Sequence, residues 1–337
     1  MNGSRKGIAI AGNLIVDKLY PIAGMPGLGE LTTINEGMSQ ASGGAVCNVI
    51  VDLAKLDPDL PLVALGRVGN DEEGAFLLNG MRACPNIDVS QVKQEGNTSF
   101  TIVMADEVTK QRTFFQYRGA NAHFCEQDID FARLDVDILH IGYILLLDAL
   151  DAPDDRYGTK MARLLHTARE HGIRTSIDVV SETGDRFSKI VPPALQYADY
   201  CIINELEAQA TTGIPLRSDA GDLLTDNMPK ALRQLKALGV SRWAVIHCPE
   251  GGYGLDENDD YVAEPSLKLS KEEIAGTVGA GDAFCAGVLY AAWQDRPIRD
   301  GLILGNGAAA CSLTTQGATE GLRCMADVEK FYSSRKG

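Results

Sequence analysis

The chain has 337 residues, of which 45% are hydrophobic and 23% are charged, and its 35 glycines are spread along the whole length. This composition excludes a disordered or fibrous protein and is typical of one large α/β domain, or of a main domain with a smaller one. The formal net charge of -15 argues against binding nucleic acid or anionic membranes through distributed Lys and Arg. Any polyanionic ligand must therefore be held locally.

The sequence offers no sign of export. The apolar run near the N-terminus is short and broken by glycine and asparagine, so it predicts no signal peptide. No stretch approaches the roughly 20 apolar residues that cross a bilayer. The eight cysteines lack CxxC or other metal-ligand spacing, and we expect buried thiols in a reducing compartment. These features predict a cytoplasmic protein.

Short apolar runs alternate with longer helical patterns along the chain. The expected buried strands are residues 7–12, 62–66, 138–142, 174–178, 200–204 and 243–247. The expected helices between them include residues 45–56, 158–172 and 228–239, and the last two end in a glycine suited to a left-handed cap. This alternation predicts an α/β fold with a mostly parallel sheet covered by helices on both faces.

Two segments, about 14–42 and 98–118, interrupt this alternation. Both are β-prone and have no helical pattern within them. We expect them to form a small antiparallel β sheet that stands off a single domain spanning residues 1–337 and acts as a lid.

Residues 276–284 read "GTVGAGDAF" and precede an apolar helical run. Glycines at 279 and 281 would let backbone N–H groups point into one concavity at a helix N-terminus, which is an anion site. Asp282 would lie in the first turn, where a carboxylate beside a phosphate is unfavourable unless it acts chemically. A general base for a hydroxyl proton fits this position. The alternative is a capping aspartate beside glycines that allow close helix packing.

Other nucleotide-binding motifs are absent from the sequence. There is no GxxxxGK[ST], and the first expected strand is not followed by GxGxxG.

The sequence resembles the ribokinase-like carbohydrate kinases, the PfkB family, at both ends. "GTVGAGDAF" is similar to the family's C-terminal DTxGAGDxF, and "GGAVCNVIVDLAKL" (43–56) with "LGRVGNDEEG" (65–74) is similar to its N-terminal signature. "GAN" (119–121) and "NELE" (204–207) also match. The resemblance implies a ribokinase-like three-layer sandwich that binds ATP and Mg²⁺.

The family's catalytic parts match particular positions. Asp282 matches the catalytic base, and Gly279, Ala280 and Gly281 match the anion hole. Asn204 and Glu207 match the motif that organises Mg²⁺ and the nucleotide phosphates, with Glu207 acting on the metal through water. The same spacing is that of a helix capping box, and both readings can hold.

The resemblance also implies residues for the acceptor and the nucleotide. The expected acceptor-binding residues are Asp17, Asn13, Gly43, Gly44, Asn48 and Arg118. The expected nucleotide-binding residues are Asn204, Glu207, His247, Gly252, Thr277 and Asn306. In each set a structural alternative stays open, namely a loop acid for Asp17, an exposed edge arginine for Arg118, a structural histidine for His247 and tight helix packing around Asn306.

Three departures from the family pattern affect these expectations. Gly276 replaces the usual aspartate that in several members helps bind a monovalent cation, so we expect weak or absent potassium activation. "HCPEGG" (247–252) replaces a common Thr-x-Gly strand end, and Pro249 lacks an N–H. Ala45 and Val46 replace residues of the ribokinase substrate loop, so ribose is not implied.

The resemblance implies ATP-dependent phosphorylation of a hydroxyl, expected to be a primary one, of a sugar or sugar derivative. A nucleoside kinase remains an alternative, because aromatic residues occur on the second lid segment. A catalytically silent sugar or nucleotide sensor is a third. Pairing of two lids into a homodimer is a family habit that the strand edges would allow.

Overall fold

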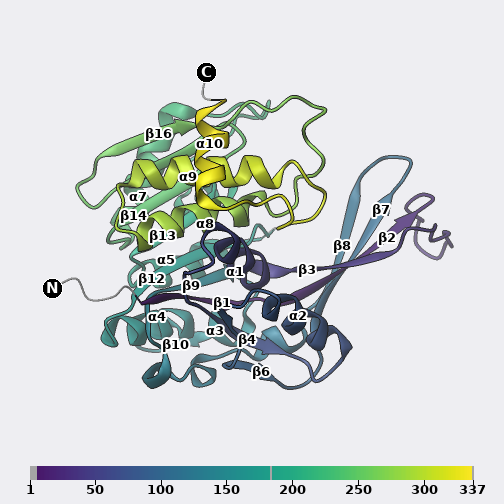
Figure 1. Cartoon of the computed structure of the whole chain (residues 1–337), viewed down its shortest axis with the longest axis horizontal. Coiled ribbons are helices and arrows are strands. Elements are labelled where there is room, and N and C mark those ends of the chain that lie inside the picture. The colour runs from purple at the N-terminus through teal and green to yellow at the C-terminus, as the bar shows by residue number, and fades with distance from the viewer. Residues whose placement is uncertain (1–5, 183, 336–337) are drawn as a thin grey trace.

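The computed structural model describes residues 6–182 and 184–335, and its centre is a ten-stranded sheet with helices on both faces (Figure 1). The strands, in order across the sheet, are β16 (Tyr261–Pro265), β15 (Gly251–Leu255), β14 (Trp243–Cys248), β13 (Tyr200–Asn204), β12 (Arg174–Val179), β9 (Val136–Ile144), β1 (Gly7–Gly12), β4 (Leu62–Val68) and β5 (Ile87–Asp88), with β6 (Val92–Gln94) also paired to β4.

The sheet is parallel from β14 to β5 and β6, and in the described residues its antiparallel pairs are β14 with β15 and β15 with β16. All six residues of β1 are buried, as expected for a strand covered on both faces. Alternate side chains enter opposite cores, since Ile8 and Ile10 pack on one side and Ala9 and Ala11 on the other.

In the part of the chain that the structure describes, five α-helices cover each face of the sheet. One face carries α1 (Gly44–Leu56), α2 (Glu72–Arg82), α8 (Ala280–Trp293), α9 (Ile298–Ser312) and α10 (Met325–Ser333). The other carries α3 (Asp148–Asp151), α4 (Lys160–Glu170), α5 (Phe187–Leu195), α6 (Glu205–Thr212) and α7 (Met228–Ala237). Shorter elements are the ribbon β10 (Pro153–Asp154) with β11 (Gly158–Thr159) and the 3₁₀ turns Gly119–His123, Glu126–Asp128, Phe131–Arg133 and Thr225–Asn227.

Helices α8 and α9 approach each other closely, as their small residues predict. A Cβ atom on Gly287 would lie 2.7 Å from the backbone nitrogen of Gly305. This contact leaves no room for a larger side chain at either position.

The segments 14–42 and 98–118 build a second sheet, which we name the outlying sheet. It contains β3 (Ser39–Gly43), β2 (Ile15–Ile22), β7 (Ser99–Asp106) and β8 (Arg112–Tyr117) in that order. Its two outer pairs are antiparallel and its central pair, β2 with β7, is parallel. Figure 1 shows this sheet projecting from the main body.

The architecture confirms the expected α/β class, with a mostly parallel central sheet, helices on both faces and a small separate sheet. None of the helices in the described residues is long and apolar enough to cross a membrane. The eight cysteines are free thiols, and four of them, Cys47, Cys201, Cys285 and Cys311, are buried.

Candidate active site

A cavity lies where the parallel strands end and α8 begins. It encloses about 260 Å³ and is bordered by residues at the carboxyl ends of β9, β12, β13 and β14 and by the first turn of α8. Its lining includes Tyr143, Asp178, Ser181, Asn204, Glu207, His247, Thr277 and Gly279 to Asp282. Ligands of open parallel sheets bind at this edge, beyond the carboxyl ends of the strands.

The loop before α8 is shaped by glycine. Gly279 is the N-cap residue and has a φ of +78°, in the left-handed region that favours glycine. A Cβ atom at this position would lie 2.5 Å from the carbonyl oxygen of Ala318. Because this helix terminus faces the cavity, its unpaired N–H groups and the helix dipole favour a bound anion.

Asp282 is the third residue of α8 and is buried beside this terminus. Its carboxylate accepts a 2.8 Å hydrogen bond from Asn48 Nδ2 on α1 and bonds of 3.1 Å to each oxygen from the Tyr143 hydroxyl. Burial raises the pKa of Asp282, and the hydrogen bonds from Asn48 and Tyr143 act in the opposite direction. The site therefore holds a buried carboxylate with raised proton affinity, as a general base requires.

Tyr143 was not among the residues expected from the sequence. It lies near the end of β9 with a φ of +61°, which is uncommon for a residue other than glycine, and residues with such strained backbone angles cluster at functional sites. The available signal was its position, directly after the run at 138–142 that predicts a strand.

Asn204 and Glu207 form the capping box at the start of α6. The Glu207 backbone N–H donates to Asn204 Oδ1, and the Asn204 backbone N–H donates to Glu207 Oε2, both at 2.9 Å. Ser181 Oγ donates to the other Glu207 oxygen at 2.8 Å. Burial raises the pKa of Glu207 to about 7. The interpretation of this motif as a helix capping box is thus confirmed. Glu207 also lines the cavity.

The donor set of the cavity suits a hard cation. Asp178, Glu207 and Asp282 all line it, and burial together with the charges of Glu207 and Asp282 raises the pKa of Asp178 well above its usual range. Within residues 6–182 and 184–335, no lysine or arginine lines this cavity. No cluster of three or more His, Cys, Asp or Glu ligands occurs among the described residues. This set fits Mg²⁺ that keeps several waters and contacts the protein through one or two carboxylates.

The expected acceptor residues gather where the outlying sheet meets α1. Asp17 on β2 lies so close to Gly43 that a Cβ atom there would be 2.2 Å from Asp17 Oδ2. The pKa of Asp17 is raised to about 6, mainly by burial; the hydrogen bond from Thr101 lowers it and the charge of Asp282 raises it. Asp17 and Asp282 are therefore close enough to interact.

The other expected acceptor residues have mainly structural contacts. Asn13 Nδ2 donates to the Tyr143 carbonyl oxygen at 3.4 Å, and a Cβ atom on Gly44 would lie 2.4 Å from the Asn13 carbonyl oxygen. Arg118 donates to the Leu145 carbonyl oxygen at 3.4 Å and lies 4.0 Å from Asp148. Its side chain is 31% exposed, so it remains accessible to a ligand.

A larger cavity of about 870 Å³ adjoins the first and shares Asn204, His247, Thr277, Ala280 and Gly281 with it. Its size is that of a pocket for a nucleotide-sized ligand. Its lining is mostly apolar and includes Phe284, Leu313 and Asn306. Asn306 Nδ2 donates to the carbonyl oxygens of Glu264 and Pro265.

A family model for the pfkB family carbohydrate kinases matches residues 12–323. This chain belongs to the pfkB family of carbohydrate kinases. The expected family and enzyme class are thus confirmed.

Relatives of this pfkB kinase act on different sugars. It is 25% identical to the ATP-dependent ribose-1-phosphate kinase of Halopiger xanaduensis, over 88% of each chain. It is also 25% identical to the 2-dehydro-3-deoxygluconokinase of Bacillus subtilis, over 92% of this chain and 91% of the relative.

Solved ribokinases confirm the fold. The ribokinase from Thermotoga maritima has a TM-score of 0.78 at 22% identity, over 97% of this chain and 99% of the other. The Arabidopsis thaliana ribokinase complexed with ribose and ATP has a TM-score of 0.78 at 17% identity, with the same coverage.

Two expected nucleotide residues of this pfkB kinase have packing roles. His247 lies 4.9 Å from the Phe284 ring, between centroids, and burial lowers its pKa to about 4, so the imidazole is neutral. Gly252 is not among the residues that line either cavity. A Cβ atom there would lie 2.9 Å from Phe284, so Gly252 packs directly against the Phe284 ring, which lines the larger cavity.

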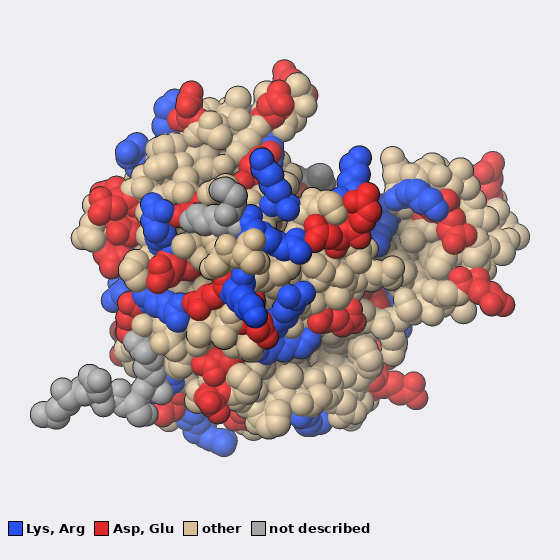
Figure 2. Space-filling model, turned by 45° about the horizontal axis from the view of Figure 1, so that its top comes forward, with Lys and Arg blue, Asp and Glu red and all other residues tan. Residues whose placement is uncertain are grey.

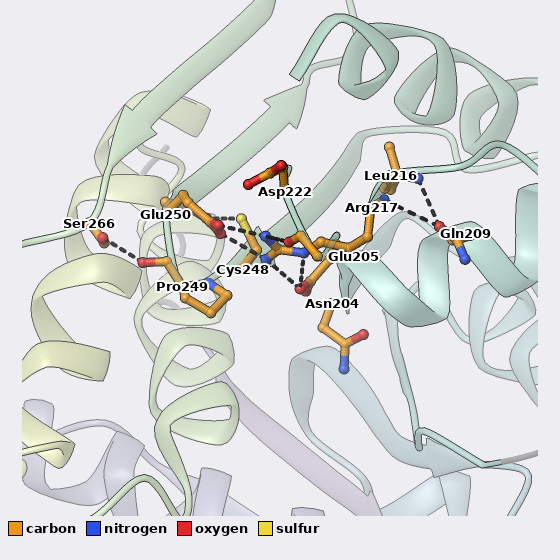
Figure 3. Close-up of polar contacts among 12 residues, drawn as sticks. Asn204, Glu205, Gln209, Leu216, Arg217, Asp222, Cys248, Pro249, Glu250 and Ser266 are labelled. Atoms are coloured by element: carbon orange, nitrogen blue, oxygen red, sulfur yellow. Dashed lines mark hydrogen bonds and ion pairs between the residues drawn. The ribbon is translucent and has the colours of Figure 1, made fainter. Parts of the chain in front are cut away.

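Arg217 joins two segments that contribute Glu205 and Pro249 to the lining of the larger cavity (Figure 3). Its guanidinium contacts Glu205 Oε1 at 2.7 and 3.1 Å, and it contacts both oxygens of Glu250 at 2.5 and 2.8 Å. Nearby, Ser266 Oγ donates to the Pro249 carbonyl oxygen at 2.7 Å. The start of α6 and the turn between β14 and β15 are thereby joined. Two carboxylates balance the Arg217 charge, so it is not directed at a phosphate.

Proposed function

We propose that this carbohydrate kinase transfers the terminal phosphoryl group of ATP to a primary hydroxyl of a sugar or sugar derivative, by direct in-line transfer. The observation that carries the proposal is the position of Asp282. It is buried at the N-terminus of α8, near Asp17 on the acceptor side, in the first turn of a helix whose Ala280 and Gly281 line both cavities.

In this proposal, each residue of the site has a defined role. Asp17 binds acceptor hydroxyls, and Asp282 orients the reacting hydroxyl and takes its proton. Asn48 and Tyr143 hold the Asp282 carboxylate in place. The N–H groups of residues 279–281 stabilise negative charge on the transferred group. The two cavities share Ala280 and Gly281, which lie directly before the base, and this arrangement would bring donor and acceptor into line.

Glu207 and Asp178 would hold Mg²⁺, in part through water. When bound, Mg²⁺ supplies to phosphate oxygens the positive charge that no lysine or arginine among the described residues of the smaller cavity provides. The same carboxylates repel one another without a cation, and this repulsion supports the assignment. We also propose weak or absent dependence on a monovalent cation, because Gly276 has no side-chain ligand.

Three wider proposals accompany this function. The outlying sheet, which carries Asp17, acts as a lid that excludes water from a single-domain enzyme. Two copies pair through this sheet. Free cysteines throughout the chain support a cytoplasmic location.

The decisive experiment measures ADP release with MgATP against pools of sugars, sugar acids, sugar phosphates and nucleosides. The Asp282→Asn variant runs beside the wild type, with Asp300→Asn, an acidic residue in the first turn of α9, as the matched control. We expect one pool to support turnover that Asp282→Asn reduces by about 10² or more and Asp300→Asn leaves unchanged.

The possible results separate the candidate functions. Near-normal turnover in Asp282→Asn would show that this carboxylate is not the base. Turnover with nucleosides alone would identify a nucleoside kinase. If no pool responds while ATP raises the unfolding temperature, the protein behaves as a sensor and the proposal fails.

A further inference from the structure

Helix α1 contains a buried carboxyl group, Asp52, that the proposed reaction does not use. Asp52 is 0% exposed, and neither of its carboxyl oxygens has a hydrogen-bond partner among the described residues. The side-chain oxygen of Asn48, one helical turn earlier, is also buried without a partner there. Buried acceptors of this kind are rare and costly, so the three oxygens require an explanation.

The helix places these groups on one line that ends at the proposed base. Residues four apart share a face of an α-helix, and a helical side chain leans toward the N-terminus, which brings the Asp52 carboxyl toward Asn48. Asn48 Nδ2 in turn donates to Asp282 Oδ2 at 2.8 Å. Asp52 thus lies on the opposite side of the Asn48 amide from the proposed base, Asp282.

The surroundings of Asp52 favour its neutral form. An ionised carboxylate without a donor is very unfavourable in the interior. Burial raises the pKa of Asp52 well above its usual range, the charge of Asp282 on α8 raises it further, and Lys55 opposes them. Lys55 Nζ donates a hydrogen bond to the Thr319 carbonyl oxygen at 2.7 Å. Other titratable groups on elements packed against α1 include His140 and Tyr143 on β9, Cys285 and Tyr290 on α8, Asp17 on β2, Glu73 on α2 and Arg67 on β4.

We propose that Asp52 is a protonated carboxylic acid whose O–H donates to the side-chain oxygen of Asn48, so that the Asn48 NH₂ group is fixed toward Asp282. A protonated carboxyl has one donor, and Asn48 Oδ1 is a buried acceptor on the same helix face that needs one. Asp52 is therefore a positioning residue that acts on the base through Asn48. This inference rests on the proposed role of Asp282.

The orientation of the Asn48 amide has a direct effect on the base. With Nδ2 toward Asp282, the amide donates to the carboxylate and steadies it. With the amide turned over, its oxygen would face the carboxylate and repel it. The Asp52 O–H selects the first orientation, because only then does Asn48 Oδ1 face a donor.

Two substitutions separate positioning from simple packing. Asp52→Asn keeps an N–H donor for Asn48, and we expect kcat within about twofold of the wild type. Asp52→Leu has the same branching as aspartate, with a larger side chain and no donor, and we expect kcat to fall about tenfold, the effect of one lost hydrogen bond, with KM for ATP unchanged. Because Asp52→Leu leaves the buried Asn48 Oδ1 without a donor, a melting curve establishes first that the variant is folded.

The protonation state can be measured without turnover. The infrared difference between wild type and Asp52→Asn at neutral pH should contain the carbonyl stretch of a protonated carboxylic acid. Asp59→Asn, which removes an exposed carboxylate near the end of the same helix, should lack this band. This readout holds even if the acceptor is never found, so its failure is distinct from failure of the proposed function.

Three outcomes would overturn the inference. The first is an infrared difference without the carboxylic acid band. The second is wild-type kcat in a folded Asp52→Leu protein. The third is a shift of the acidic limb of the pH–rate profile to lower pH in Asp52→Asn, because removal of a negative charge near Asp282 would lower the pKa of the base. If Asp52→Leu does not fold, the infrared comparison decides.

Discussion

At the residue scale, the buried carboxyl groups of Asp282 and Asp17 differ in how far their surroundings stabilise the ionised form. Both are acids in largely buried positions, and burial raises the pKa of each. Asp282 receives donors from Asn48 and Tyr143, which favour its ionised form. Asp17, next to a second carboxylate, keeps a raised pKa of about 6. The ionised Asp17 carboxylate is therefore unfavourable in the free protein, and in the proposed function a bound polyhydroxyl ligand would stabilise it by donating hydrogen bonds.

Because the buried Asp17 carboxylate destabilises the free protein when it is ionised, we predict that Asp17→Asn stabilises the free protein while it impairs acceptor binding. Between pH 4 and 6 the unfolded state ionises Asp17 and the folded state keeps its proton, so wild-type stability falls as pH rises through this window. Above pH 6 the substitution should raise the free energy of unfolding by about 1–3 kcal/mol. The acceptor KM should rise about tenfold or more.

Chemical unfolding of Asp17→Asn and wild type between pH 4 and 8 tests this prediction. The gain should be present at pH 7.5 and vanish near pH 4, and the exposed control Asp59→Asn should show neither effect. A loss of stability at pH 7.5, or a gain that does not depend on pH, would contradict the assigned cause.

At the scale of elements, the loop before α8 combines two separate demands on glycine. Gly279 needs both a positive φ and a close approach to Ala318. Gly172, after α4, has a similar φ of +75° but no atom within 4 Å of an added Cβ. Comparison of Gly279 with Gly172 thus separates the effect of conformational strain from the effect of limited space in the loop before α8.

We expect Gly279→Val to reduce kcat/KM for ATP by at least about 10², because the loop must move away from Ala318 and its N–H groups lose their alignment. Gly172→Val should lower stability by about 1 kcal/mol or more and leave kinetics unchanged. Steady-state kinetics with melting curves measure both. Normal activity in Gly279→Val would mean that this loop does not bind the phosphate.

The segment around Gly276 gives a prediction about cations. A Cβ atom on Gly276 would lie 2.8 Å from the Thr315 carbonyl oxygen and 3.1 Å from Gln316 Cα. The position therefore lacks both a ligand and the room for one in the present backbone. We expect replacement of tetramethylammonium by potassium to change kcat less than about twofold. A large increase in rate with potassium would show that backbone oxygens alone suffice for a cation site.

At the scale of the whole molecule, the central sheet was predictable from the sequence because its parallel strands are buried on both faces. β1 and β13 have the bounds that their apolar runs predict, and the other expected strands differ by a few residues at their ends. The short strands β5 and β6 were not predicted, since two or three residues at an edge leave no clear apolar pattern.

The candidate site was predictable only where a motif kept its residues together. The sequence gives no sign that Asn48 bonds Asp282, because the two are 234 positions apart and meet only through packing of α1 on α8. The unusual φ of Tyr143 and the unpaired oxygens of Asp52 are likewise properties of the folded chain. The Arg217 contacts depend on a loop that has no motif.

The outlying sheet has the exposed apolar surface that best fits a dimer interface. Its strands and connections expose large apolar side chains, among them Leu28, Leu31, Met38, Val108 and Phe114, each at least 63% exposed. Figure 2 shows the projecting part of the molecule as largely uncharged on the face in view. Monomeric proteins rarely expose a broad apolar surface, so we expect two copies to pair through this sheet.

The last prediction tests this pairing. The wild-type protein should sediment at twice its chain mass of 36.2 kDa, and Leu31→Glu with Phe114→Glu should yield the monomer, because a buried charge without a partner opposes association. Tyr261→Glu, at an exposed aromatic on the far edge strand β16, should stay dimeric. Sedimentation equilibrium distinguishes these states. A wild-type monomer at micromolar concentration would leave the apolar surface to cover the acceptor site instead, as a lid that closes when substrate binds.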